Sequence, residues 1–177
     1  NSAISTEDGK LVAYFNGINV EDKTFRSMSN GFNLAKEVVE WLYYLSDDDL
    51  PQGSLFLPWP GRPDSVLLLY QSQAVLEQPG GGGTYGSVDL SLAIINTKAN
   101  NGRGRVVQRA INVLHDTIQY GKLTAAKHAN GRDWWILVRE NYASRYYRFL
   151  LDTEGIRLVG EQTFASLDPD GFGQAVF

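Results

Sequence analysis

The side chains of this sequence that could carry acid–base or metal chemistry are few and widely spaced. The chain has two histidines, His115 and His128, and no cysteine. The absence of cysteine excludes disulfides, thiol catalysis and zinc–thiolate sites. A catalytic metal site built on either histidine would need carboxylates from distant loops. Since nothing in the spacing brings such loops together, we predict neither a metal site nor a cofactor.

Three aspartates, Asp64, Asp133 and Asp152, stand beside turns at the expected ends of strands. A pair of such carboxylates serves as acid and base in glycoside hydrolases, so a carbohydrate-active enzyme is one interpretation. The other is a turn role, because aspartate often accepts hydrogen bonds from its own turn. We expect the turn role, with His128 hydrogen-bonded to Asp133 across a tight hairpin. We predict that the chain is not an enzyme.

Three tryptophans also adjoin turns. Trp59 lies in the stretch Pro-Trp-Pro-Gly, and Trp134 and Trp135 follow the turn Asn-Gly-Arg-Asp at the start of an aliphatic run. The pair either forms a surface that stacks on a ligand or faces opposite sides of a strand that is buried on both faces. We expect packing on both faces, with direct ligand stacking as the alternative.

The overall composition bounds the class of protein. The chain has 177 residues, of which 43% are hydrophobic, and a formal net charge of −4 at pH 7. This length suits one globular domain or part of a larger one, and the acidic balance argues against a dedicated nucleic-acid binder. We interpret the basic cluster Arg103, Arg105 and Arg109 as a solvated face. No apolar run approaches the roughly 18 residues of a membrane span, and the first residues do not resemble a signal peptide.

Most of the chain reads as strand. Apolar alternation, β-branched residues and turn signals such as Asn16-Gly17 predict strands over ten ranges. These ranges are 10–16, 24–28, 55–57, 65–74, 88–96, 105–114, 123–128, 133–139, 145–152 and 156–163.

Other segments depart from this pattern. Residues 33–45 carry apolar side chains at helical spacing, with Asn33 as a possible cap, and predict one helix. The acidic triplet 47–49 and the Asp-Pro-Asp-Gly turn at 168–171 are interpreted as solvated turns, with calcium binding as the alternative. The Gly-rich stretch 78–86 lacks the Lys-Ser/Thr of a nucleotide loop and is expected to be a hairpin loop.

The strands recur in units. Gly53 and Gly121 each begin a short apolar strand, a turn with Gly-Arg, an aspartate and a long apolar strand. Four-stranded repeats of about 40–50 residues are typical of β-propeller blades. We therefore expect a partial blade over 1–32, a helical insertion and loop over 33–52, blades over 53–120 and 121–170, and the start of another blade at 171–177.

Several stretches carry a resemblance to a known family. The runs "GKLTAAKHANGRDWWILV", "YYRFLLDTEGI", "DGKLVAYFNGINV" and "LPQGSLFLPWPG" resemble the propeller-like, WD-repeat-like region of large secreted Bacteroidetes surface proteins. Members of that family typically carry a C-terminal type IX secretion sorting domain and often have a cysteine near the first hairpin, which this sequence lacks. The resemblance implies a secreted or cell-surface location and export by the type IX secretion machinery. It also implies that this chain is a fragment of a longer protein.

We therefore expect an all-β fold, a partial β-propeller of four-stranded blades with one inserted helix near residues 33–45. The expected function is a non-catalytic scaffold or binding module that does not span a membrane. It would present the loops 58–62, 78–86 and 141–144 to a protein or glycan partner, with the remaining blades supplied by the same or another chain. A structural subunit of an extracellular assembly and a carbohydrate-active enzyme domain remain the alternatives.

Overall fold

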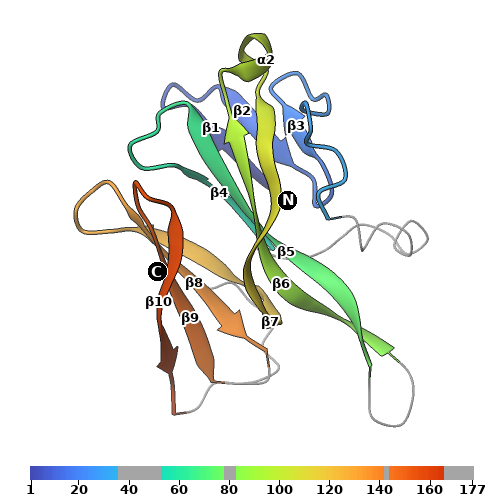
Figure 1. Ribbon diagram of the computed structural model, residues 1–177, viewed down its shortest axis with the longest axis vertical. Coiled ribbons are helices and arrows are strands. Elements are labelled where there is room, and N and C mark those ends of the chain that lie inside the picture. Colours follow the sequence, from blue (N-terminus) through green and yellow to red (C-terminus); the bar gives the residue numbers. More distant parts are fainter. Residues whose placement is uncertain (36–52, 78–82, 142–143, 166–177) are drawn as a thin grey trace.

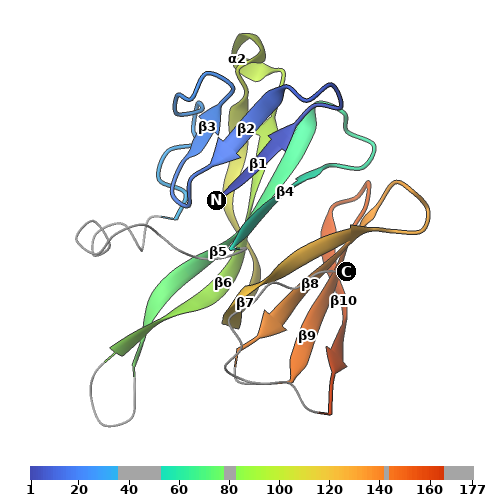
Figure 2. The same ribbon diagram turned by 180° about the vertical axis from the view of Figure 1, so that it is seen from behind.

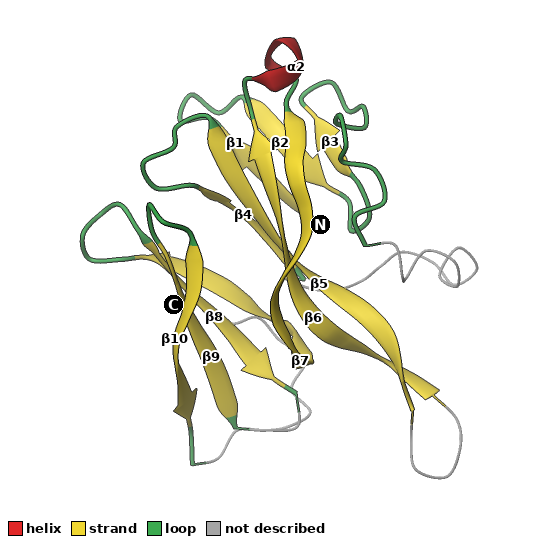
Figure 3. Ribbon diagram, viewed as in Figure 1, coloured by secondary structure: helices red, strands yellow, loops and turns green. Residues whose placement is uncertain are grey.

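The computed structural model of the chain describes residues 1–35, 53–77, 83–141 and 144–165. Regular structure in these residues is almost entirely antiparallel strand, arranged as a three-stranded and a seven-stranded sheet (Figure 1, Figure 3). The prediction of an all-β fold is thereby confirmed. The single short helix among the described residues, α2 (Ala99–Gly102), lies in the connection between the long strands β6 and β7.

The two sheets follow the chain in simple order. The small sheet is a meander, β1-β2-β3, made of β1 (Ser2–Ser5), β2 (Leu11–Phe15) and β3 (Val20–Asp22). The large sheet has the order β10-β9-β8-β7-β6-β5-β4, so every strand pairs with its neighbours in sequence. Its strands are β4 (Ser54–Pro58), β5 (Ser65–Glu77), β6 (Gly83–Asn96), β7 (Arg105–Lys127), β8 (Trp134–Glu140), β9 (Arg145–Leu151) and β10 (Ile156–Thr163).

Strand β7 serves both halves of the large sheet. Its first part pairs with β6, from Arg105 to Ile118, and its last part pairs with β8, at Ile118 and then from Leu123 to Lys127. The sequence predicts two strands here, 105–114 and 123–128, with a break near Gly121, and that separation is wrong. Gly121 adopts a positive φ of 73° without ending the strand, and the pairing register shifts between Ile118 and Leu123. The glycine bends the strand and carries it from one half of the sheet to the other.

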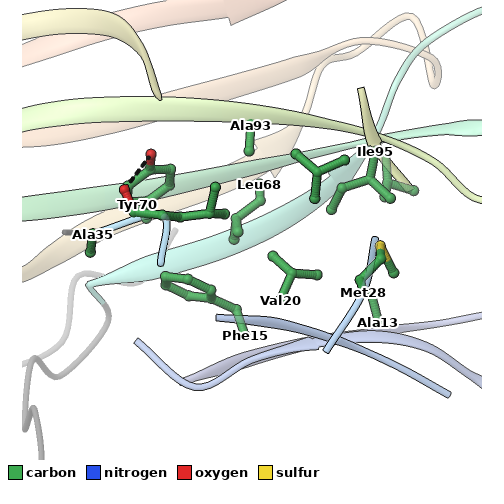
Figure 4. Close-up of a cluster of buried hydrophobic side chains, with 12 residues drawn as sticks. Ala13, Phe15, Val20, Met28, Ala35, Leu68, Tyr70, Ala93 and Ile95 are labelled. Carbon is green, nitrogen blue, oxygen red and sulfur yellow. Dashed lines mark hydrogen bonds between the residues drawn. The ribbon is translucent and has the colours of Figure 1, made fainter. Parts of the chain in front are cut away.

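The large sheet folds back on itself and makes three layers with the small one (Figure 1, Figure 2). One buried cluster lies between the small sheet and one face of β5 and β6, and it includes Phe15, Val20 and Leu68 (Figure 4). A second cluster joins the opposite face of β5 to β8 and β9, and it includes Leu67 and Phe149. Strand β5 is therefore covered on both faces, which explains its unbroken apolar run.

The small sheet differs from its sequence-based prediction. The strand expected at 24–28 is a turn, and β3 ends at Asp22. The reason is the Asp22 side chain, which accepts hydrogen bonds from the backbone N–H and the hydroxyl of Thr24 and closes a tight loop in which Phe25 has a φ of 58°. Strand β1 has no counterpart among the predicted strands. It lies beside β4, with the Ser2 and Ser54 hydroxyl oxygens 2.9 Å apart.

Other sequence-based expectations fall partly or wholly outside the described residues. Of the helix expected at 33–45, only 33–35 are described, and residues 34–35 lie in a turn. The acidic triplet 47–49 and the turn 168–171 lie outside the described residues. The loop expected at 78–86 is shorter than predicted at its second end, because β6 already begins at Gly83.

The basic cluster is exposed or partly exposed, as expected of a solvated face, but its arginines also make specific contacts. Arg103 donates through Nε to the carboxylate of Asp22 at 2.8 Å, and the Asp22 side chain is 1% exposed. Arg109 donates to the carbonyl oxygens of Phe32 and Asn33 at 2.9 and 2.8 Å. Ser29 forms a parallel bridge with Arg105. These contacts fasten the segment after β3 along the edge of β7.

The buried Asp22 carboxylate makes the joint between the sheets sensitive to pH. Burial acts to raise the pKa of Asp22, but the bonds from Thr24, Arg103 and the backbone outweigh it and lower the pKa from 3.8 to about 2. A lowered carboxyl pKa stabilises the fold above the unfolded value, and this contribution is lost as the pH falls through about 2. We predict that Arg103→Met raises the pKa of Asp22, lowers the free energy of unfolding and moves the onset of acid unfolding to higher pH. Urea unfolding between pH 7 and 2 measures this.

The matched control is Arg26→Met, which removes an exposed arginine from the same loop. It should leave the acid unfolding profile close to that of the original chain. Equal profiles for the two variants would show that the Arg103–Asp22 contact does not hold the small sheet in place.

Candidate functional site

Three turns of the large sheet gather on one side of the molecule. They are the β4–β5 turn at residues 59–64, the β7–β8 turn at 128–133 and the β9–β10 turn at 152–155 (Figure 1). The Trp59 indole N–H donates to the carbonyl oxygen of Asp152 at 3.1 Å. The pairing of Trp134 with Leu151 sets the other two turns side by side. We call this group of three turns the turn end.

The β4–β5 turn packs closely against the β9–β10 turn. Gly61 has a φ of 75°, and a Cβ atom at this position would lie 2.9 Å from the Cγ2 atom of Thr153. Both the backbone conformation and the close approach therefore favour glycine. The exposed Arg62 side chain lies over the Trp59 indole ring, with its guanidinium carbon 3.8 Å from the ring centroid. This cation–π contact holds a positive charge at the surface of the turn end.

The β7–β8 turn is organised by a buried carboxylate. Asp133 is 5% exposed, and it accepts hydrogen bonds from Arg132 Nε at 2.7 Å and from Asn130 Nδ2 at 2.6 Å. Arg132 and then Asn130 lower the pKa of Asp133 from 3.8 to about 2, against the opposing effect of desolvation. A carboxylate held in this way is a fixed anion that closes the turn.

The expected side-chain bond between His128 and Asp133 is not the one that forms. The backbone N–H of His128 donates to the Asp133 carbonyl oxygen at 2.9 Å, whereas the ring atom Nδ1 accepts from the backbone N–H of Asn130 at 3.1 Å. The Asp133 carboxylate is occupied by Arg132 and Asn130 instead, because the turn brings them nearer. The His128 ring lies against Trp135, with the ring centroids 5.2 Å apart.

The tryptophan pair does face opposite sides of β8, and both rings are half-buried. Trp134 packs at the margin of the second buried cluster, with Lys127 Nζ 4.0 Å from the centroid of its ring. Trp135 lies on the other face, between His128 and the Arg148 guanidinium, whose carbon is 5.9 Å from the Trp135 ring centroid. The expectation of packing therefore fits Trp134 better than Trp135.

The other two acidic candidates, Asp152 and Asp64, interact with different partners. Asp152 pairs with Arg157, which together with the turn backbone lowers the pKa of Asp152. Asp64 is exposed, and its backbone carbonyl accepts hydrogen bonds from Thr97. Asp133 is thus paired with an arginine of its own turn and Asp152 with an arginine at the start of β10, an arrangement that favours the turn role over paired acid–base chemistry.

A second ionic cluster lies near the opposite end of β8 and β9. The Tyr147 hydroxyl donates to Asp116, while Arg145 bonds to Glu140 and Glu161. Burial and then the acceptor Asp116 raise the pKa of Tyr147 well above its ordinary value. The tyrosine is thereby kept protonated, so the cluster ties β7, β8, β9 and β10 together rather than offering a nucleophile.

Of the three loops proposed from the sequence, residues 58–62 belong to the turn end. Residues 78–82 and 142–143 of the other two loops lie outside the described residues. The sequence shows the two Gly-Arg turns at Gly61 and Gly131, but it does not assign a role to Arg62 or Arg132. Arg157 lies in neither turn and has no such signal.

No protein-family model, curated protein or solved structure matches this chain. Among the described residues, no group of three or more His, Cys, Asp or Glu side chains is placed to hold a metal ion. Across the same ranges, no helix has the length and apolar character needed to cross a membrane.

The turn role of Asp133 can be separated from a chemical role by substitution. We predict that Asp133→Ala lowers the unfolding temperature clearly, because it removes the acceptor shared by Arg132 and Asn130. Asp64→Ala is the matched control at an exposed turn position and should change the unfolding temperature little. Differential scanning calorimetry of both variants measures this. An unchanged unfolding temperature for Asp133→Ala would contradict the turn role.

Proposed function

We propose that this chain is a non-catalytic binding module of β-propeller type, from a secreted or cell-surface protein. In this proposal the turn end is the surface that contacts a protein or glycan partner. The observation that carries the proposal is the gathering of three turns around Trp59 and Arg62. The resemblance to secreted Bacteroidetes surface proteins adds the expectation of export by the type IX secretion machinery.

The topology supports the propeller part of the proposal. The strands β4, β5, β6 and the first part of β7 form one antiparallel four-stranded unit. The last part of β7 with β8, β9 and β10 forms a second. Consecutive blades of a propeller are four-stranded meanders that pack face to face. The buried cluster between β5 and β8–β9 is the kind of contact that such blades make.

The charges at the turn end indicate which partner groups it would meet. Arg132 and Arg157 are paired with Asp133 and Asp152, so their charges are satisfied within the chain. Arg62 instead lies on the Trp59 ring with its side chain exposed. A guanidinium held in place in this way is suited to bidentate contact with a carboxylate, from an acidic side chain or an acidic sugar.

The non-catalytic part of the proposal rests on the same contacts. An acid–base pair for glycoside hydrolysis needs two carboxyl groups that face a common substrate. Asp133 faces Arg132 of its own turn, and Asp152 faces Arg157 at the start of β10. These contacts therefore favour a binding module over a carbohydrate-active enzyme.

Binding to arrayed glycans and acidic peptides tests the proposal. We predict that the labelled chain binds those glycans and peptides on the array that carry carboxylates. Arg62→Ala should weaken this binding about tenfold, which is the effect of losing one charge-assisted contact. Arg26→Ala, at another exposed arginine, is the matched control and should bind like the original chain. Binding that is equal in both variants, or no binding to any member, would overturn the proposed role of the turn end.

The alternative function, a structural subunit of an extracellular assembly, gives a different result. Light scattering would then show self-association that rises with protein concentration and needs no ligand. Arg62→Ala would leave that association unchanged unless the turn end were itself the assembly contact.

A further inference from the structure

A polar cavity lies on the face of β5, β6 and β7 that also carries the first buried cluster. Its volume is about 330 Å³. The side chains on this face of β5 are apolar up to Tyr70, and the small sheet packs against them up to that point (Figure 4). Beyond it, Ser72 pairs with Asp89 across the strands, and Tyr70 pairs with Ser91. Since directly paired residues share a face, these polar side chains form the floor of the cavity.

The floor continues onto β7 and is held in place there. Ser91 pairs with Asn112, and Asp89 pairs with His115. The Asp89 carboxylate accepts a hydrogen bond from Asn112 Nδ2 at 2.8 Å, and it lies 2.6 Å from His115 Nδ1. The carboxylate is therefore oriented before any ligand arrives, which is a feature of binding sites.

The opposite wall is formed by the segment after β3. Leu34 and Ala35 are buried there and offer an apolar surface. The Tyr70 hydroxyl donates to the Leu34 carbonyl oxygen at 3.4 Å. The segment is fixed by the bonds from Arg109 to Phe32 and Asn33. The cavity thus has one polar and one apolar side, both anchored to the sheet.

Two local features of this cavity are costly for the fold. The buried Oδ1 atom of Asn33 accepts no hydrogen bond, although buried acceptors are nearly always satisfied. Ala110, which also lines the cavity, has a φ of 53° inside a β-strand. Strained non-glycine residues and unsatisfied polar atoms gather at ligand sites more than elsewhere.

The lining selects the class of ligand. It offers the Asp89 carboxylate as an acceptor and hydroxyl groups at Ser72 and Ser91, so it suits a molecule with several hydroxyl donors. Its apolar wall suits a ligand that presents C–H groups on one face. The Asp89 carboxylate contacts His115 Nδ1, and the lining also carries the cationic side chain of Arg109, which disfavours a free ammonium group as the ligand.

We propose that this cavity binds a neutral monosaccharide-sized polyol. Its volume is at the small end of ligand sites, so it suits one sugar ring rather than an oligosaccharide. The site lies on the face of β5 opposite the cluster that carries Trp59 and Trp134. It is independent of the function proposed for the turn end.

Titration of the full, ¹⁵N-labelled chain tests this inference. The probes are glucose, galactose, mannose and N-acetylglucosamine, with ethylammonium as the cationic competitor. We expect at least one sugar to shift the side-chain amide signals of Asn33 and Asn112 in a saturable way. Ethylammonium should give no saturable shift.

Variants locate the binding. Ser72→Phe fills the cavity, and Asn112→Leu removes an exposed amide from its lining. Each should weaken the sugar affinity about tenfold or more by calorimetry. Gln108→Leu is the matched control at another exposed amide of β7 and should keep the affinity. Arg62→Ala should also keep it, which separates this site from the turn end.

Three results would overturn the inference. They are the absence of saturable binding for all four sugars, sugar binding that both Ser72→Phe and Asn112→Leu leave unchanged, and preferential binding of ethylammonium. Because Asn112 is exposed, its variant should fold even if Ser72→Phe does not, and circular dichroism verifies this.

Discussion

The structure depends on the burial of β5 on both of its faces. Val66, Leu68 and Tyr70 point to the small sheet, while Leu67 and Leu69 point to β8 and β9. All five side chains are at most 6% exposed. A strand in this position joins two hydrophobic cores, so neither neighbouring layer can separate without exposing it to water. The positions of the turn end and of the polar cavity both follow from this arrangement.

Strand β7 makes the arrangement possible. By pairing with β6 along its first part and with β8 along its last part, it lets one continuous sheet cover itself. The bend near Gly121 brings the β7–β8 turn to the same side as the β4–β5 turn. The hydrogen bond from Trp59 to Asp152 then ties the two halves together on that side. A binding surface built this way stands on strands rather than on a long loop, which limits how far its side chains can move.

The sequence predicts the strands well where one physical signal dominates. The apolar run of β5 and the turn before Trp134 are recognised because burial and turn chemistry are local properties. The strand wrongly expected at 24–28 shows the limit, since its β-like pattern is overruled by the bonds from Thr24 to Asp22. The merging of two predicted strands into β7 could not be foreseen, because it depends on partners far away in the sequence.

The candidate site is predicted only in part, for the same reason. Asp133 and its partners Asn130 and Arg132 belong to one turn, but the partner of Trp59, Asp152, is set by the packing of two turns against each other. The cavity beside Tyr70 gives no sequence signal at all. Its polar side chains come from three strands. Within the sequence of each single strand, they look like ordinary solvent-facing positions.

Urea unfolding of two single variants, Leu67→Ala and Leu68→Ala, tests the central claim most directly. These neighbours point to opposite faces of β5, and they are 2% and 0% exposed. If both faces are covered, each variant should lose about 2–5 kcal/mol of unfolding free energy, as buried leucines do. If either variant stays within about 0.5 kcal/mol of the original chain, as surface substitutions do, one face of β5 is open to water and the three-layer arrangement is wrong.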